Sequence, residues 1–171
     1  MSNYKLGFIG AGKMATAIAA GIVNQKALSS KEIIASSRSE ESLKHFVEKC
    51  GAETSQSNAV VLKEASTVII GVKPQMIEGV CAELNIDDST HVISIAAGVK
   101  MSSLMKWLKT DKITRVMPNT PLMVGLGASA YCCAPGVTDA EKQTVETLFG
   151  CAGIIKAVEE NDIDAVTGVS G

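Results

Sequence analysis

Short apolar runs alternate with longer amphipathic stretches along the chain. Runs of roughly four to eight apolar residues are typical of buried strands, and an apolar position every three or four residues is typical of a helix. Strands are therefore expected at Lys5–Ile9, Ile33–Ser36, Glu53–Thr54, Val68–Val72, His91–Ile95, Ile113–Met117, Ala128–Cys133 and Ile154–Val158. Helices are expected at Lys13–Gln25, Glu40–Lys49, Asn58–Glu64, Pro74–Leu84, Ser102–Lys109 and Asp139–Phe149, with a last one beginning near Asp162.

This alternation predicts an α/β fold, a Rossmann-like, doubly wound and mainly parallel sheet with helices on both faces. Val68–Val72 and His91–Ile95 are almost wholly apolar, as expected of strands in the centre of such a sheet. The one marked shift in composition is the acidic stretch Glu159–Asp164, which we interpret as a solvated boundary.

Composition narrows the class of protein. The 171 residues suit about one domain, and the net charge of −2 gives no basic surplus for nucleic acid or an anionic membrane. We find no apolar run of membrane-spanning length and no signal-peptide pattern. Five scattered cysteines without a C-x-x-C pair indicate reduced thiols and no metal site, so a cytoplasmic location is expected.

A glycine loop lies between the first expected strand and the first expected helix. Gly10-Ala11-Gly12-Lys13-Met14-Ala15 fits the G-x-G-x-x-G/A pattern of dinucleotide-binding folds. Gly10 permits the tight turn, Gly12 lets backbone N–H groups approach a pyrophosphate, and Ala15 lets the helix pack on the strand. The helix N-terminus then supplies unpaired donors and a positive dipole. The alternative is a glycine-rich turn that serves packing only.

The end of the second strand bears on which dinucleotide binds. NAD-binding folds place Asp or Glu there, whereas this chain has Ser36, Ser37 and Arg38. Hydroxyls and a guanidinium suit a 2′-phosphate, so NADP(H) is preferred and NAD(H) is the alternative. Ser37 or Ser39 could instead cap the next helix, with Glu40 completing a capping box after Ser37, and both roles can coexist.

Three later strand ends change from apolar to turn-forming residues where a cofactor would lie. They are Val72-Lys73-Pro74, Ala96-Ala97-Gly98 and the segment around Asn119, which Pro118 and Pro121 stiffen. The Asn119 amide suits a nicotinamide carboxamide. Each segment taken alone is also an ordinary strand-exit turn.

Together these motifs resemble those of the Δ1-pyrroline-5-carboxylate reductases. The resemblance covers the whole chain and rests on Gly7–Gly12, Val72–Gln75, Ala96–Gly98, Met117–Pro121 and Asp164–Gly171, in the family's order. The Met-Pro-Asn-Thr-Pro segment followed by Ala-Val-Thr-Gly-Val-Ser-Gly is the most specific part. Lys13 departs from the family, which often has Asn or Gln there.

The resemblance implies NADPH-dependent reduction of pyrroline-5-carboxylate to L-proline, the last step of proline biosynthesis. The implied cofactor-binding residues are Ile9, Gly10, Ala11, Gly12, Lys13, Met14, Ser37, Asn58, Val72, Lys73, Pro74, Ala96, Ala97 and Gly98. Without the family, Asn58 is interpreted as a plain N-cap.

The family also implies two domains. Residues 1–160 would form the NAD(P)-binding Rossmann domain, and residues 161–171 would begin a truncated helical domain that forms the homo-oligomer and contacts the substrate. We therefore expect this piece to be a monomer or a weak dimer, with little or no reductase activity.

The implied chemistry is hydride transfer to a cyclic imine, which does not require an ionisable catalytic residue, and none is assigned here. His45 and His91 are interpreted as structural, and the pairs Asp87-Asp88 and Glu159-Glu160 as solvated. The alternatives are another NADP-dependent oxidoreductase of this fold, such as a β-hydroxyacid dehydrogenase relative, and a non-catalytic NADP-binding module. A methyltransferase-like use of the glycine loop is a remote third.

Overall fold

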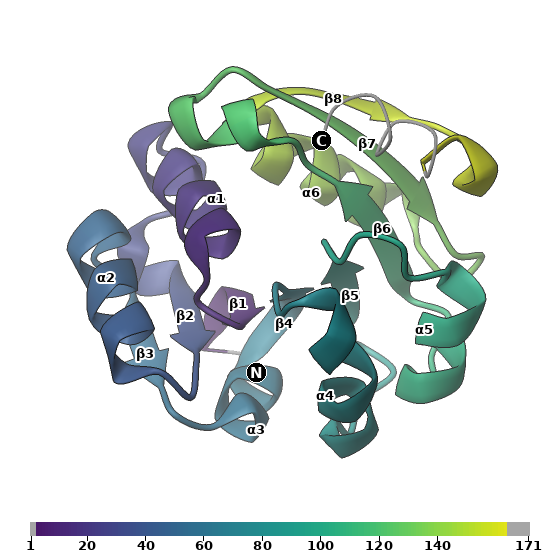
Figure 1. The fold of residues 1–171 in the computed structure, drawn as a ribbon, viewed down its shortest axis with the longest axis horizontal. Coiled ribbons are helices and arrows are strands. Elements are labelled where there is room, and N and C mark those ends of the chain that lie inside the picture. Colours follow the sequence, from purple (N-terminus) through teal and green to yellow (C-terminus); the bar gives the residue numbers. More distant parts are fainter. Residues whose placement is uncertain (1–2, 164–171) are drawn as a thin grey trace.

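A computed structural model describes residues 3–163, within which eight strands form a single sheet in the order β3-β2-β1-β4-β5-β6-β7-β8 (Figure 1). The strands are β1 (Tyr4–Ile9), β2 (Ile33–Ser36), β3 (Glu53–Ser55), β4 (Ala65–Ile70), β5 (His91–Ser94), β6 (Ile113–Met117), β7 (Gly127–Cys133) and β8 (Gly153–Ala157). The helices are α1 (Lys13–Asn24), α2 (Glu40–Cys50), α3 (Asn58–Glu64), α4 (Ile77–Glu83), α5 (Met101–Leu108) and α6 (Asp139–Gly150). Short 3₁₀ turns occupy Ser30–Glu32, Pro74–Met76 and Thr120–Val124.

The sheet confirms the expected Rossmann-like, mainly parallel fold. The first six strands follow the doubly wound order 3-2-1-4-5-6, and every described pairing is parallel except that of β6 with β7. β4 and β5 lie at the centre, as their continuous apolar runs predict. Nothing in the pattern of β7 distinguished a reversed strand from a parallel one.

Two elements start three residues away from their expected positions. β4 begins at Ala65 because that residue pairs with Tyr4, and it ends at Ile70, before the Val72 that was expected to close it. The expected helix over Pro74–Leu84 starts as a 3₁₀ turn in which Met76 N donates to Lys73 O at 2.9 Å, and becomes α-helical only afterwards. Residues 160–163 are helical, while most of the predicted last helix and of the predicted region 161–171 lies outside the described residues.

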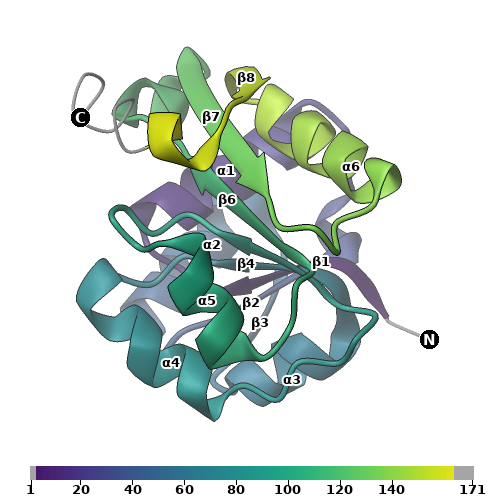
Figure 2. The ribbon, with the colours of Figure 1, turned by 90° about the vertical axis from the view of Figure 1, so that its right-hand side faces the viewer.

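Helices cover both faces of the sheet. α1, α2 and α6 pack on one face, and Figure 2 shows α6 on one side of β6 and β7 with α5 on the other. On the face that α1 and α2 cover, the rings of Phe8 and Phe46 meet edge to face with their centroids 5.5 Å apart. α3, α4 and α5 pack on the other. A Cβ on Gly7 would lie 2.6 Å from Val61 Cγ1, so the missing side chain lets α3 lie close against β1.

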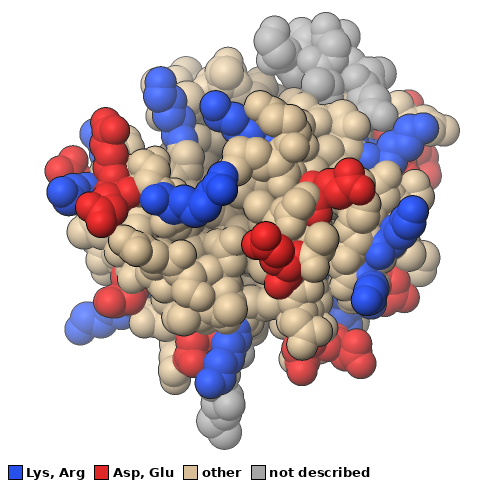
Figure 3. Space-filling model, turned by 60° about the horizontal axis from the view of Figure 1, so that its bottom comes forward, with Lys and Arg blue, Asp and Glu red and all other residues tan. Residues whose placement is uncertain are grey.

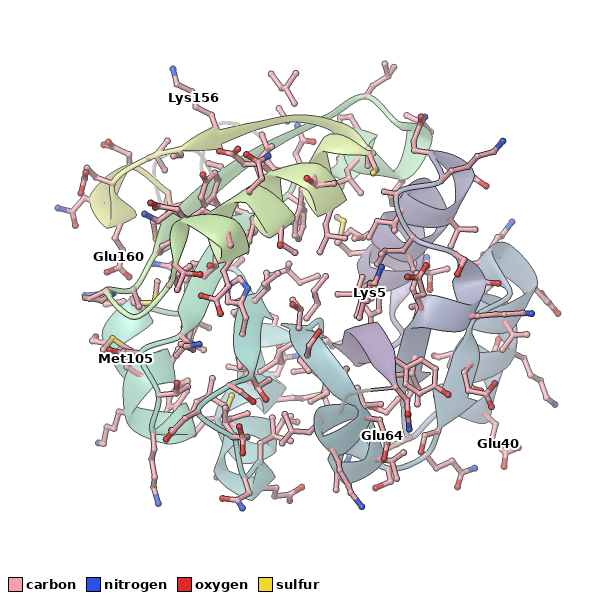
Figure 4. The ribbon with its side chains drawn as sticks, turned by 180° about the vertical axis from the view of Figure 1, so that it is seen from behind. Lys5, Glu40, Glu64, Met105, Lys156 and Glu160 are labelled. Carbon is pink, nitrogen blue, oxygen red and sulfur yellow. The ribbon has the colours of Figure 1, made fainter. Side chains whose placement is uncertain are left out.

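Glu160 connects three elements after the last strand. Its Oε1 accepts from the Nη1 of buried Arg115 on β6 and from Met101 N at the start of α5, both at 2.6 Å. Figure 4 labels Glu160 beside α5, the helix that carries Met105. The interpretation of Glu159-Glu160 as a solvated pair was wrong for Glu160, because the buried guanidinium needs a carboxylate partner.

The histidines and cysteines have structural positions. His45 is exposed on α2, and His91 is buried at the start of β5 with Nε2 2.9 Å from Thr114 Oγ1. All five cysteines lie within the described residues, and they are thiols rather than disulfides, as expected. Over residues 3–163 we find no helix long and apolar enough to cross a membrane and no cluster of side chains suited to hold a metal ion.

We expect stability to fall at acid pH through His91. Burial lowers the pKa of its imidazole from the ordinary 6.5 to about 4. The contribution of neutral His91 to the unfolding free energy is therefore fully present above pH 6.5. It is lost as the pH falls toward 4, because the histidine of the unfolded chain takes up a proton first. The loss is up to about 3 kcal/mol of unfolding free energy.

Urea unfolding at pH 7 and pH 4 measures this loss. His91→Gln, which keeps a polar group near Thr114, should flatten the pH dependence, whereas His45→Gln at an exposed site should leave it unchanged. Parallel pH profiles for the wild type and His91→Gln would show that another group is responsible.

Candidate functional site

A cavity of about 560 Å³ opens where β1, β2 and β4 end, a volume ordinary for a small-molecule site. It is lined by Gly10, Ala11, Gly12, Ser37, Arg38, Ser39, Ser42, Asn58, Gly71, Val72, Lys73, Met76, Gly79, Val80 and Glu83. A larger cavity of about 790 Å³ lies at the opposite edge of the sheet, between the end of α3 and the segment that precedes β5. Parallel α/β sheets bind ligands at the carboxyl ends of their strands, so the smaller cavity is the candidate site.

The fold itself requires Gly10. Its φ of +97° is a conformation that side chains rarely adopt, and a Cβ there would lie 3.0 Å from the carbonyl carbon and oxygen of Gly71. Its N–H donates to Ser36 O at 2.9 Å, which ties the loop to the end of β2. The predicted role of Gly10 in a tight turn therefore matches the geometry.

Gly12 differs, because the fold does not require a glycine there. Its φ of −75° suits any residue, and a Cβ would have a single neighbour, Gly71 O at 3.9 Å. Gly12 is the N-cap of α1, and no side chain caps that helix. The first-turn N–H groups and the positive end of the helix dipole thus have no capping side chain.

The loop between β2 and α2 presents hydroxyls and a guanidinium. Ser39 Oγ accepts from Ser42 N at 3.2 Å and caps α2, while Ser37 Oγ accepts from Ser39 N at 3.2 Å. Each hydroxyl keeps its hydrogen to donate, and Arg38 beside them is exposed. The predicted Ser37–Glu40 capping box is wrong, because the cap is two residues further on.

Asn58 reaches the cavity from the start of α3. Its Oδ1 accepts from the Ser36 hydroxyl at 2.7 Å. The N-cap of α3 is Ser57, so the interpretation of Asn58 as an N-cap was wrong. Ser36 is fully buried and contacts Asn58 rather than the open cavity.

The cavity thus brings together eight of the residues named from the sequence. They are Gly10, Ala11, Gly12, Ser37, Arg38, Asn58, Val72 and Lys73. The remainder do not line it: Ile9 and Ser36 are buried beneath it, Lys13, Met14 and Pro74 lie on α1 and the turn after β4, and Ala96, Ala97, Gly98 and Asn119 follow β5 and β6. Asn119 Oδ1 accepts from Ala128 N at 2.9 Å, which leaves its amide N–H₂ as a donor.

Sequence reasoning missed the wall that α4 provides. Met76, Gly79, Val80 and Glu83 line the cavity at positions i, i+3, i+4 and i+7, the spacing of one helical face. The spacing shows that they share one helical face, but the sequence does not mark which face of the helix turns toward the cavity. Gly71 and Ser42 were also missed.

Few of the residues that line the cavity are ionisable. The charged ones are Arg38, Lys73 and Glu83, and no histidine or cysteine is among them. On the face shown in Figure 3, basic and acidic side chains are interspersed around a mostly uncharged surface. Such a site suits a cofactor that supplies the reactive group itself.

Comparisons with known proteins agree with this geometry. Residues 5–98 match the family described as "NADP oxidoreductase coenzyme F420-dependent". A pyrroline-5-carboxylate reductase of Arabidopsis thaliana is 38% identical over 171 residues, which are 99% of this chain and 62% of that protein. One from Methanosarcina acetivorans is 37% identical over 174 residues, covering 100% of this chain and 64% of that protein.

Solved structures of pyrroline-5-carboxylate reductases are also similar to this chain. A Coxiella burnetii pyrroline-5-carboxylate reductase superposes with a TM-score of 0.91 at 33% identity, over 99% of this chain and 64% of that one. A Plasmodium falciparum pyrroline carboxylate reductase with NADP bound superposes with a TM-score of 0.88 at 30% identity, over 100% of this chain and 63% of that one. The chain thus spans somewhat less than two thirds of the relatives it matches. An Aquifex aeolicus prephenate dehydrogenase at 13% identity shares only the fold, with a TM-score of 0.79.

The two loop glycines should respond differently to alanine. Gly10→Ala should lower the unfolding free energy by roughly 2 kcal/mol or more, because of the positive φ and the contact with Gly71. Gly12→Ala should change it by less than about 1 kcal/mol, since the backbone conformation is ordinary. Urea unfolding compares the two, and equal losses would show that Gly12 is also required by the fold.

Proposed function

The chain belongs to the family described as NADP oxidoreductase, coenzyme F420-dependent, and on this premise we propose that it binds NADPH in the cavity where β1, β2 and β4 end. It corresponds to the cofactor-binding domain of the pyrroline-5-carboxylate reductases. The observation that carries the proposal is the cradle at Gly12. A Cβ there would occupy free space in front of an uncapped helix N-terminus, which is the arrangement that accepts a pyrophosphate.

The loop after β2 supports NADPH over NADH. In folds of this kind the ribose of the adenosine half lies at the end of β2, where a carboxylate would repel a 2′-phosphate. Ser37, Arg38 and Ser39 provide hydroxyl donors and a cation there instead. The NADP bound to the Plasmodium relative is consistent with this choice.

We place the nicotinamide end of the cofactor along the segments that follow β4, β5 and β6, of which only the segment after β4 lines the cavity. Val72 to Pro74 and Ala96 to Gly98 follow adjacent strands β4 and β5. Asn119 follows β6 and keeps an amide N–H₂ that could donate to a carboxamide oxygen. These assignments extend the site along the carboxyl edge of the sheet.

We further propose that the protein to which this chain corresponds reduces pyrroline-5-carboxylate to L-proline. The cofactor supplies a hydride from C4 of the nicotinamide. The residues of this chain bind and orient it, and none is assigned to move a proton. Contacts with the substrate and assembly into a homo-oligomer are assigned to the predicted helical domain from residue 161 onward, and a cytoplasmic location suits the five thiols.

The cofactor preference can be measured directly by calorimetric titration. NADPH should bind at least 10-fold more tightly than NADH. Arg38→Ala should weaken the binding of NADPH about 10-fold, because it removes a charge-assisted contact with the 2′-phosphate, and should change the binding of NADH less than 2-fold. Lys44→Ala on the exposed surface of α2 is the matched control. Tighter binding of NADH would contradict the proposal.

Turnover separates this domain from a complete reductase. With pyrroline-5-carboxylate and NADPH, this 171-residue chain should bind NADPH but form proline at least 100-fold more slowly than a full-length relative, because groups that position the substrate are expected elsewhere. Proline formation at a comparable rate would overturn this expectation. NADPH binding without turnover in the full-length relative would favour a non-catalytic module.

A further inference from the structure

We infer that Ser36 is a positioning residue of the cofactor site: its buried hydroxyl fixes the orientation of the Asn58 amide. The inference rests on the proposed binding of NADPH. Ser36 ends β2 and is fully buried, whereas Asn58 begins α3 and lines the cavity. The two residues are joined by the 2.7 Å hydrogen bond from Ser36 Oγ to Asn58 Oδ1.

This hydrogen bond decides which end of the Asn58 amide faces the ligand. The serine hydroxyl has one hydrogen to donate, and Asn58 Oδ1 at 2.7 Å is a closer acceptor than Phe8 O at 3.3 Å. With Oδ1 held by Ser36, the amide nitrogen is directed away from the strand and toward the cavity. Asn58 therefore presents two donors, which suit a ribose hydroxyl or a phosphate oxygen.

Ser36 also holds the opposite wall of the site through its backbone. Its carbonyl accepts from Gly10 N at 2.9 Å, in the turn that leads to α1. One buried residue thus joins the glycine loop through its main chain and Asn58 through its side chain. Its backbone contact survives substitution, so the contribution of the side chain can be tested alone.

Loss of the hydroxyl should act on binding through Asn58. In Ser36→Ala the amide loses the partner of Oδ1 and can rotate, so the donors face the cavity for only part of the time. Loss of a single hydrogen bond of this kind should raise the dissociation constant for NADPH roughly 3- to 10-fold. Ser129→Ala, which removes another buried serine hydroxyl on β7 away from the cavity, is the matched control and should leave the constant unchanged.

A double-mutant cycle tests this dependence on Asn58. Calorimetric titration with NADPH, carried to millimolar concentration, gives the dissociation constants of the wild type, Ser36→Ala, Asn58→Ala and the double variant. If Ser36 acts through Asn58, Ser36→Ala weakens binding in the wild-type background and changes it less than 2-fold when Asn58 is already alanine. Equal effects in both backgrounds would overturn the inference, and so would no effect of Ser36→Ala on the wild type.

Further measurements keep the outcomes distinct. Thermal unfolding by circular dichroism reports whether each variant folds. If Ser36→Ala does not fold, Ser36→Cys keeps the volume with a weaker donor and takes its place in the cycle. If the wild type itself does not bind NADPH, the proposed function fails, whereas binding by the wild type with an additive cycle removes only the role of Ser36.

Discussion

Backbone hydrogen bonds at the ends of β1 and β2 hold the loop on which the candidate site depends. Gly71 N donates to Ile9 O at 2.8 Å, and Gly10 N donates to Ser36 O at 2.9 Å. These bonds bring the exits of β2, β1 and β4 close together, and a Cβ on Gly10 would lie 3.0 Å from the carbonyl carbon and oxygen of Gly71. A Cβ on Gly71 would lie 3.3 Å from that of Ala15, which is why α1 can start directly over the strand ends. The free N-terminus of α1 thus follows from the pairing of the strands.

Local signals in the sequence predicted most of the fold. Apolar runs and helix periodicity gave β1, β2, β5 and β6 to within a residue or two, and the glycine pattern located the site. The direction of β7 could not be read in this way, because a buried strand has the same composition in either orientation. The partner of Glu160 was equally hidden, since Arg115 is 45 positions away and meets it only after β6 is in the sheet.

The candidate site, like the fold, was predicted only in part. Residues on the glycine loop and the β2 exit were predicted because their types have a direct chemical reason. The α4 wall was missed because Met76, Gly79 and Val80 have no chemistry that marks them, and their face toward the cavity depends on how α4 packs. The sequence left the cap of α2 open between Ser37 and Ser39, and the observed start of α2 at Glu40 decides for Ser39.

The antiparallel direction of β7 determines where the chain leaves the sheet. β7 is antiparallel to β6, and β8 is parallel to β7. Ala157 at the end of β8 pairs with Tyr131, which in turn pairs with Val116 near the end of β6. The polypeptide therefore leaves the sheet close to its carboxyl edge, where Glu160 fixes it to the start of α5. Residues 160–163 therefore lie beside the start of α5, at the carboxyl edge of the sheet where the candidate cavity also opens.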